Sequence, residues 1–236
     1  MLRRERDMLK RTLVLLSCIV FLGFQTGYVM AQDKITGPWY WIMVKTSSPG
    51  GAVVTDEDWI KDGTGGKLTE DKLAKDGITK KIMSVKFKNK LKWKEGEITP
   101  TGGNNVNDLL VKIKHAVGDV NDHCSYAVIN AVSKQAKKGV TARVGSDDSI
   151  KVWLNGKDVH TNKVDRGAGD FQDTFDVNLK KGGNVLVVKV CEKGGGWSMF
   201  VGIDAKLTYD LKFKGFPVEP KSKLATSWSW VKTQRI

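Results

Sequence analysis

RVGSDDSIKVWLNGKDVHTN at 143–162, DTFDVNLKKGGNVLVVKVCEK at 173–193 and GGGWSMFVGI at 194–203 are the stretches that decide the fold. Alternating apolar and polar residues flank a tight turn at Gly145–Asp148. Asn155-Gly156 marks a second turn, because this dipeptide accepts positive φ at both turn positions. Such a series of hairpins predicts an antiparallel β-sandwich, whose polar loops are the natural place for a ligand.

Short strand-like stretches recur along the rest of the chain, with turns between them, while helix-period patterns are scarce. One helical turn is predicted at Thr69–Asp76. The pattern favours an all-β, antiparallel sandwich over an α/β domain. The predicted strands are Trp39–Lys45, Val85–Lys94, Leu109–Lys114, Tyr126–Ser133, Val140–Gly145, Ile150–Leu154, Thr174–Leu179, Asn184–Cys191, Met199–Asp204 and Leu207–Phe213.

Residues 1–31 have the layout of a cleaved secretory signal peptide: a basic start, the apolar run Thr12–Phe24, and Ala31 as a small residue before the cut. An uncleaved anchor and a lipoprotein signal at Cys18 are the two alternatives. We therefore expect an exported protein, either secreted, periplasmic or at the cell surface. The sandwich is predicted over 32–213, followed by a C-terminal tail at 214–236 that includes a short helix.

The charge of the chain is carried by lysine. Removing residues 1–31 takes away five basic and two acidic side chains, which lowers the net charge from +13 to +10. Only Arg143, Arg166 and Arg235 of the remaining basic residues are arginine, which argues against specific nucleic-acid recognition. In Val85–Lys94 five lysines alternate with apolar residues, which indicates a solvated strand face or a basic strip for an anionic polysaccharide.

Two cysteines remain after cleavage, Cys124 and Cys191. An exported compartment allows them to form a disulfide, but their apolar surroundings also suit two free, buried thiols. The tail has a similar pair of interpretations. It either docks on the sandwich through Trp228 or Trp230, or attaches the domain to an envelope protein.

No catalytic motif is present in the sequence. There is no Gly-x-Ser-x-Gly, His-Glu-x-x-His, phosphate-binding Gly-Lys-Ser/Thr or Cys-x-x-Cys, and His115, His123 and His160 are scattered. The sequence therefore predicts a protein that is not an enzyme.

The stretch Gly145–Lys157 (GSDDSIKVWLNGK) resembles the signature hairpin of galactose-binding-like jelly-roll domains, the accessory modules of secreted bacterial proteins. Leu179–Val190, Gly196-Trp197 and the Trp-rich strand Trp39–Val44 fit the same pattern, so the resemblance covers roughly 37–204. It implies a jelly-roll β-sandwich with ligand loops at one end and carbohydrate as the usual ligand.

Four loop residues form the predicted site: Asp147, Asp148, Arg166 and Trp197. The adjacent carboxylates offer hard oxygen ligands for a structural Ca²⁺. The Ser-Asp-Asp turn is similar to one that holds calcium against sugar hydroxyls in flocculin-type lectin domains. Trp197 would stack on a pyranose and Arg166 would clamp a hydroxyl or an acidic sugar. Each residue also has a structural interpretation, namely turn hydrogen bonds for the aspartates, core packing for Trp197 and an ion pair for Arg166.

These expectations favour a non-catalytic carbohydrate-binding module, with a polysaccharide or glycan as partner and no certain cofactor. The alternative is a structural or protein-interaction module of an envelope assembly without a sugar ligand.

Overall fold

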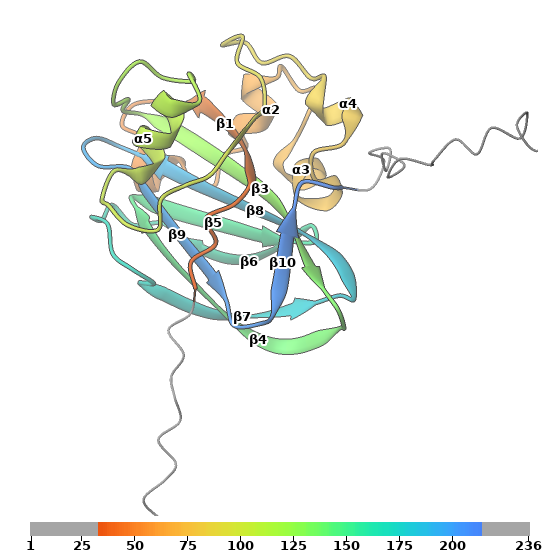
Figure 1. The fold of residues 1–236 in the computed structure, drawn as a ribbon. Helices are drawn as coiled ribbons and strands as arrows, with labels where there is room; N and C mark the ends of the chain where they lie inside the picture. Colours follow the sequence, from red (N-terminus) through yellow and green to blue (C-terminus); the bar gives the residue numbers. More distant parts are fainter. Residues whose placement is uncertain (1–32, 214–236) are drawn as a thin grey trace, which may run out of the picture. The chain divides into compact units, whose positions relative to one another are not determined.

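Ten strands and five short helical segments make up the computed structural model, which describes residues 33–213 (Figure 1). The strands are β1 (Trp39–Lys45), β2 (Lys94–Gly96), β3 (His123–Ser133), β4 (Lys137–Asp147), β5 (Ser149–Leu154), β6 (Lys157–Asn162), β7 (Asp173–Leu179), β8 (Gly182–Glu192), β9 (Ser198–Ile203) and β10 (Leu207–Asp210). The helical segments are η1 (Gly51–Val54), α2 (Trp59–Gly63), α3 (Glu70–Asp76), α4 (Lys80–Met83) and α5 (Asn105–Lys112).

Two antiparallel sheets form a sandwich. The seven-stranded sheet has the order β2-β1-β3-β8-β5-β6, with β10 also paired to β3, and the three-stranded sheet has the order β7-β4-β9. The prediction of an antiparallel β-sandwich is therefore confirmed. The end of β4, the start of β5 and the end of β8 lie at the same end of the sandwich. Ser149 at the start of β5 pairs with Cys191 near the end of β8, and Asp147 at the end of β4 pairs with Ser198 of β9.

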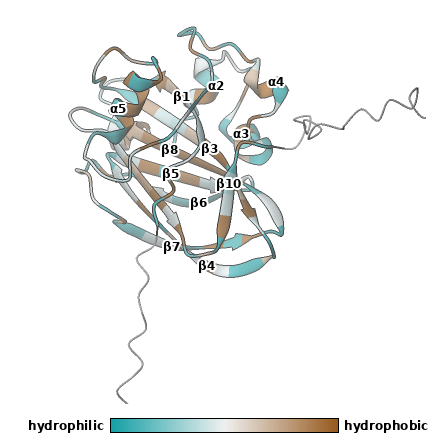
Figure 2. Cartoon of the chain, in the orientation of Figure 1, coloured by the Kyte–Doolittle hydropathy of each residue, from teal (hydrophilic) through white to brown (hydrophobic). Residues whose placement is uncertain are grey.

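The seven-stranded sheet is covered on both faces. Along β8, Val188 and Val190 face the core between the sheets, while Val187 and Cys191 belong to a second core beneath the helical segments. Figure 2 shows hydrophobic segments along the central strands of this sheet, including β3, β5 and β8. Burial on both faces explains the continuous apolar run of β8, which sequence alternation alone would not require.

Most predicted strands are present. The bounds of β1 match the prediction, and those of β3, β4, β5, β7, β8, β9 and β10 lie within a few residues of it. The helix expected at Thr69–Asp76 is α3, which Thr69 caps by accepting a hydrogen bond from the Lys72 amide. The sequence pattern missed β6 and the short helices η1, α2 and α4.

The predicted strand Leu109–Lys114 is wrong, because this segment belongs to α5 and the turn after it. Val106, Leu109 and Leu110 are buried at the i, i+3, i+4 spacing of a helix. The side chain of Asn105 fixes the start of α5 by exchanging hydrogen bonds with the backbone of Met199. A short apolar run does not by itself distinguish a strand from a buried helix.

The predicted strand Val85–Lys94 is also wrong, since only Lys94 lies in a strand, β2. The alternating burial is present, with Phe87 and Trp93 inside. However, Lys90 has a φ of 62°, and the Asn89 side chain donates to the Met43 carbonyl at 2.9 Å. Side-chain hydrogen bonds hold this segment where a strand ladder was expected.

The five lysines of this segment do not form one basic strip. Lys94 Nζ donates to the Ile113 carbonyl at 2.5 Å, and Lys88 Nζ lies 3.1 Å from an Asp62 carboxylate oxygen. Lys86, Lys90 and Lys92 are exposed. The lysine row is therefore divided between structural contacts and separate solvated side chains.

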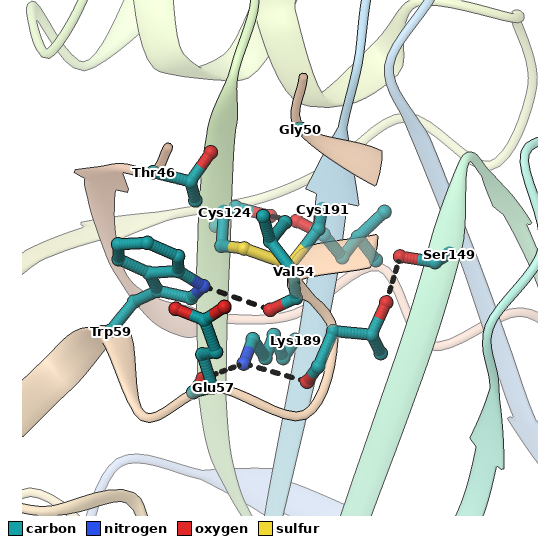
Figure 3. The surroundings of a disulfide bond; sticks show 12 residues. Thr46, Gly50, Val54, Glu57, Trp59, Cys124, Ser149, Lys189 and Cys191 are labelled. Carbon is teal, nitrogen blue, oxygen red and sulfur yellow. Dashed lines mark hydrogen bonds between the residues drawn. A yellow bond between two sulfur atoms is a disulfide. The ribbon is translucent and has the colours of Figure 1, made fainter. Parts of the chain in front are cut away.

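A disulfide joins the two central strands, because Cys124 of β3 pairs with Cys191 of β8 (Figure 3). Figure 3 shows it beside Val54 and Trp59, which belong to the same buried cluster. The open question of whether the two cysteines pair is thus answered by the structure. The bridge lies one residue before Glu192, at the end of β8 where the polar loops meet.

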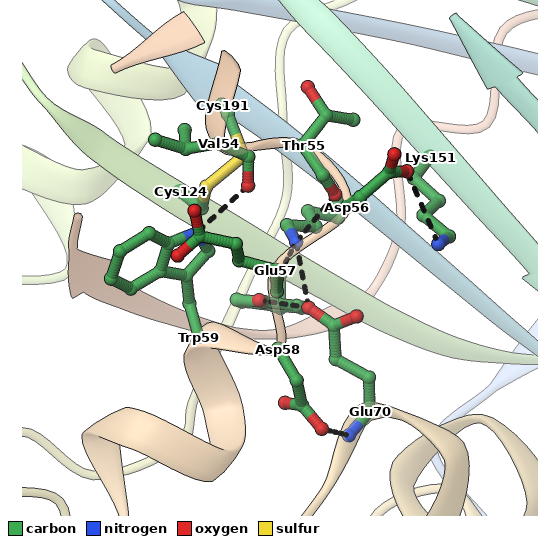
Figure 4. A network of polar contacts seen from close by, with 12 residues as sticks. Val54, Thr55, Asp56, Glu57, Asp58, Trp59, Glu70, Cys124, Lys151 and Cys191 are labelled. Atoms are coloured by element: carbon green, nitrogen blue, oxygen red, sulfur yellow. Dashed lines mark hydrogen bonds and ion pairs between the residues drawn. A yellow bond between two sulfur atoms is a disulfide. The ribbon is translucent and has the colours of Figure 1, made fainter. Parts of the chain in front are cut away.

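A buried ion pair fixes the helical segments to the sheet. Lys189 of β8 donates to the Thr55 carbonyl at 2.9 Å, the Glu57 carbonyl at 2.6 Å and Glu70 Oε1 at 2.8 Å. Tyr126 also donates to Glu70 Oε1, at 2.5 Å. Figure 4 shows Glu70 reaching toward the segment that contains Thr55 and Glu57. All three ammonium protons of Lys189 have acceptors, as a buried ammonium group requires.

The predicted signal peptide (1–31) and C-terminal tail (214–236) lie outside the described residues. Within residues 33–213, none of the helices has the length and apolar character needed to span a bilayer.

Candidate functional site

Three acidic side chains meet where the polar loops gather: Asp147 and Asp148 at the β4–β5 turn, and Glu192 at the end of β8. We call them the acidic cluster. Each offers a carboxylate oxygen, and the three oxygens lie within 4.8 Å of one another. A Ca²⁺ ion bound at 2.3–2.6 Å from each ligand could be shared by oxygens at these separations.

Backbone amides hold Asp148 in place. Its Oδ1 accepts a hydrogen bond from the Arg166 amide at 3.0 Å, and its Oδ2 accepts one from the Lys193 amide at 2.9 Å. These bonds tie the loop after β6 and the loop after β8 to the β4–β5 turn. Each carboxylate oxygen keeps a second lone pair, so Asp148 can also bind a cation.

Asp147 is more exposed to solvent than Asp148. Its Oδ2 accepts from the Ala168 amide at 3.2 Å, and the residue is half-buried. A methyl group on Gly196 would lie 2.9 Å from this oxygen and 2.6 Å from the Gly103 carbonyl. The cluster is therefore approached by two glycine loops, whose residues Gly103 and Gly195 are exposed.

Glu192 is the unusual member of the acidic cluster. Its side chain has no exposed surface, and neither Oε1 nor Oε2 has a hydrogen-bond partner among the described residues. The backbone amide of Gly194 lowers the pKa of Glu192, but it does not form a hydrogen bond with either carboxylate oxygen. A buried carboxylate without a partner is costly. A cation shared with Asp147 and Asp148 would supply the missing partner.

The pKa values of all three groups are shifted upward. Burial and the charges of Asp148 and Asp147 raise the pKa of Glu192 to about 8. Burial and the Asp148 charge raise the pKa of Asp147 to about 6. Burial also raises the pKa of Asp148, and the Lys193 and Arg166 amides partly offset this. Three neighbouring carboxyl groups disfavour ionisation until a positive charge joins them.

The Arg166 side chain makes its contacts next to the acidic cluster, with Ser146 and Asp173. Its guanidinium forms a two-pronged ion pair with Asp173, at 3.0 Å and 2.6 Å, and donates to the Ser146 hydroxyl at 2.9 Å. His160 Nε2 also lies 3.2 Å from Asp173 Oδ2. The guanidinium is thus engaged within the protein, and the structure places the Arg166 amide, rather than its side chain, beside the predicted site.

Trp197 does not supply the expected stacking surface. Its side chain is fully buried in the core between the sheets, as the structural interpretation anticipated. Its backbone amide donates to the Asn104 side chain at 3.1 Å, which anchors the glycine loop that reaches Asp147. The residue therefore shapes the site through the backbone.

Glu192 was not anticipated from the sequence. Asp147 and Asp148 stand out as an adjacent pair, whereas Glu192 follows an apolar strand 44 positions later. The only available signal was its place at the end of β8, because pairing of β5 with β8 brings the Glu192 end of β8 beside the start of β5.

No protein-family model matches the chain, and no curated protein sequence resembles it significantly. Among solved structures, it is similar to the PA14 domain of the MpAFP antifreeze protein, with 14% identity and a TM-score of 0.40 over 77% of this chain and 92% of the other. It is also similar to a PA14 sugar-binding domain from an RTX adhesin, with 16% identity and a TM-score of 0.32 over 49% and 70%. At these values the similarities do not identify a family for this protein.

Proposed function

We propose that this protein is a non-catalytic carbohydrate-binding module that holds its ligand through a Ca²⁺ ion in the acidic cluster. The observation that carries the proposal is the buried carboxylate of Glu192 beside Asp147 and Asp148, which lacks a hydrogen-bond partner in the part of the chain that the structure describes. The module would be exported by the signal peptide, act outside the cell or in the envelope, and have the jelly-roll topology that the sequence suggested.

The donor set fits calcium. Ca²⁺ prefers hard oxygen ligands and takes six to eight of them, so three carboxylates leave several positions for water or ligand oxygens. Vicinal hydroxyls of a sugar are neutral oxygen donors with suitable spacing. Because Asp147 faces the exposed glycine loops, we expect the remaining positions to open toward solvent there.

In this proposal the residues have separate roles. Asp147, Asp148 and Glu192 would ligate the ion and compensate its charge. Arg166 and Lys193 would position Asp148 through their backbone amides. These amides belong to two different loops, so ion binding would order both loops together.

The first test is calcium titration of the full chain by isothermal calorimetry, followed by a glycan array in Ca²⁺ and in EDTA. We expect saturable Ca²⁺ binding in wild type, its loss in Glu192→Gln, and glycan signals that require Ca²⁺. Glu95→Gln is the matched control, because Glu95 is exposed on β2 outside the acidic cluster.

Absence of Ca²⁺ binding would refute the proposal. Calcium binding without any glycan signal would instead support the alternative, a structural module of an envelope assembly in which the ion only closes the loops.

A further inference from the structure

A second site lies at the opposite end of the sandwich from the acidic cluster. The cluster adjoins Ser149 of β5 and includes Glu192 of β8, whereas Asn155 and Gly183, at the other ends of these strands, line a pocket of about 600 Å³. This volume is in the usual range for small-ligand pockets.

Four lysines surround this pocket, which we call the lysine pocket: Lys75, Lys180, Lys181 and Lys212. All four are exposed, and none of their amines forms a hydrogen bond or ion pair with another described residue. The pocket has one acidic lining residue, Asp76, whose carboxylate pairs with Lys72 Nζ at 2.6 Å. The pocket therefore has an uncompensated positive charge.

The backbone that carries Lys180 and Lys181 is rigidly fixed. The buried Asn184 side chain donates to the carbonyls of Lys180 and Gly182, both at 3.0 Å, and accepts from the Lys180 amide at 2.8 Å. These contacts hold the β7–β8 turn in one conformation.

The other walls are fixed as well. The Lys212 amide donates to Asp210 at 2.9 Å, and Asn130 donates to the Lys212 carbonyl at 3.0 Å. Phe213 packs against Gly77, where a methyl group would lie 2.0 Å from the ring. The backbone that carries these lysines is thus already ordered before a ligand binds, which lowers the entropic cost of binding.

The chain's own tail does not complement this charge. Residues 214–236 follow Phe213 directly, and they contain five basic side chains and only one acidic side chain, Glu219. An external anion is therefore the better match for the lysine pocket.

The pocket also lacks the features of a nucleic-acid site. Among the described residues that line it there is no arginine, and the one aromatic residue, Phe213, is only 5% exposed, so its ring is not available for base stacking. We propose that the lysine pocket binds the carboxylate or sulfate groups of an acidic polysaccharide. This site needs no calcium and is independent of the acidic cluster.

The test is fluorescence anisotropy with the full chain in excess EDTA, which leaves the acidic cluster without metal. The probes are a heparin octasaccharide, which is rich in sulfate, and an alginate octasaccharide, which has carboxylates only. We expect the Lys180→Gln/Lys181→Gln/Lys212→Gln variant to bind at least one probe about tenfold more weakly than wild type. The affected probe identifies the anionic group.

The matched control is Lys86→Gln/Lys90→Gln/Lys92→Gln, which removes the same charge from exposed lysines outside the pocket. We expect it to change affinity less than about twofold, and both variants to keep the wild-type melting temperature, since exposed lysines contribute little to stability. Equal losses in the two variants, no binding of either probe by wild type, or tighter binding of oligothymidylate of equal charge would overturn the proposal.

Discussion

Two buried glutamates, Glu70 beside β8 and Glu192 at the end of β8, show two different uses of a carboxylate. Glu70 is 6% exposed and meets Lys189 and the Tyr126 hydroxyl. Glu192 has no exposed surface, and within residues 33–213 neither of its carboxylate oxygens has a hydrogen-bond partner. The first carboxylate finds its partners within the protein, whereas for the second we propose that a bound cation supplies them.

The difference is visible in how each charge is compensated. Burial raises the pKa of Glu70 and lowers that of Lys189, and each partner opposes the shift of the other. For Glu192, burial and two neighbouring aspartates all act in the same direction. A buried acid whose neighbours are also acidic identifies a ligand site better than burial alone does.

The largest effect is expected for breaking the complete pair. Lys189→Met leaves Glu70 buried without its counter-charge, which should reduce the free energy of unfolding by about 3–5 kcal/mol. This corresponds to a fall of roughly 10 °C in melting temperature for a domain of this size. Differential scanning calorimetry measures it. The double variant Glu70→Gln/Lys189→Met should recover much of the loss, and a silent single variant would contradict the assigned role of the pair.

The next largest effect on stability is expected from Ca²⁺ binding to Glu192. Ca²⁺ at about 100 times its dissociation constant should stabilise the protein by about 2.7 kcal/mol, or roughly 5–10 °C in melting temperature. Glu192→Gln should abolish this gain, while Glu70→Gln should preserve it despite a lower starting stability. Thermal unfolding of the three proteins in Ca²⁺ and in EDTA provides the measurement. An undiminished gain in Glu192→Gln would exclude Glu192 as a ligand.

The metal-free protein should become less stable as the pH rises. Glu192 has a pKa of about 8 in the folded state, against an ordinary value of 4.5. The unfolded chain therefore releases this proton first, so stability is highest below pH 4.5 with respect to this group and falls up to pH 8. We expect a melting temperature several degrees lower at pH 8 than at pH 5 in EDTA.

Two controls define this pH effect. Glu192→Gln should flatten the profile, leaving the smaller, same-sign contribution of Asp147 with its pKa of about 6. Saturating Ca²⁺ should remove or reverse the decline, because the ion binds the ionised carboxylates. A decline of the same size in Glu192→Gln would assign it to other groups.

The smallest effect is expected from the glycine loop. Gly196→Ala would place a methyl group 2.6 Å from the Gly103 carbonyl and 2.9 Å from Asp147 Oδ2. We expect about tenfold weaker Ca²⁺ binding by calorimetry, equivalent to about 1.4 kcal/mol. Gly194→Ala is the control, since its nearest neighbour atom lies 3.8 Å away. Equal affinities would show that the loop does not touch the ion site.

The strands from Arg143 onward could be predicted well because alternation and turn residues are local signals. Asp147 and Asp148 were identified for the same reason. The prediction that these strands form a series of hairpins was wrong: β5 pairs with β6, but the connections β4–β5, β7–β8 and β8–β9 each cross from one sheet to the other. Glu192 and the lysine pocket depend on which strand ends meet, and a single sequence does not reveal pairings such as β5 with β8. Among the helical segments α3 was predicted, whereas η1, α2 and α4 were missed because they are too short to show a helical period.

Arg166 and Trp197 show a second limit of prediction from a single sequence. Both residues were correctly placed near the loops, but their side chains point into the protein. Residue type suggests a chemistry, whereas the direction of a side chain is decided by packing with segments that lie far away in the sequence.

The length of β8 sets a distance between the two proposed sites. Nine residue steps separate Gly183 from Glu192, and at about 3.3 Å per step the ends of the strand lie about 30 Å apart. A monosaccharide or a free anion can therefore occupy only one end of the domain. A glycan longer than this span can reach both ends at once, so its affinity should rise steeply with chain length, in the manner of a two-point attachment.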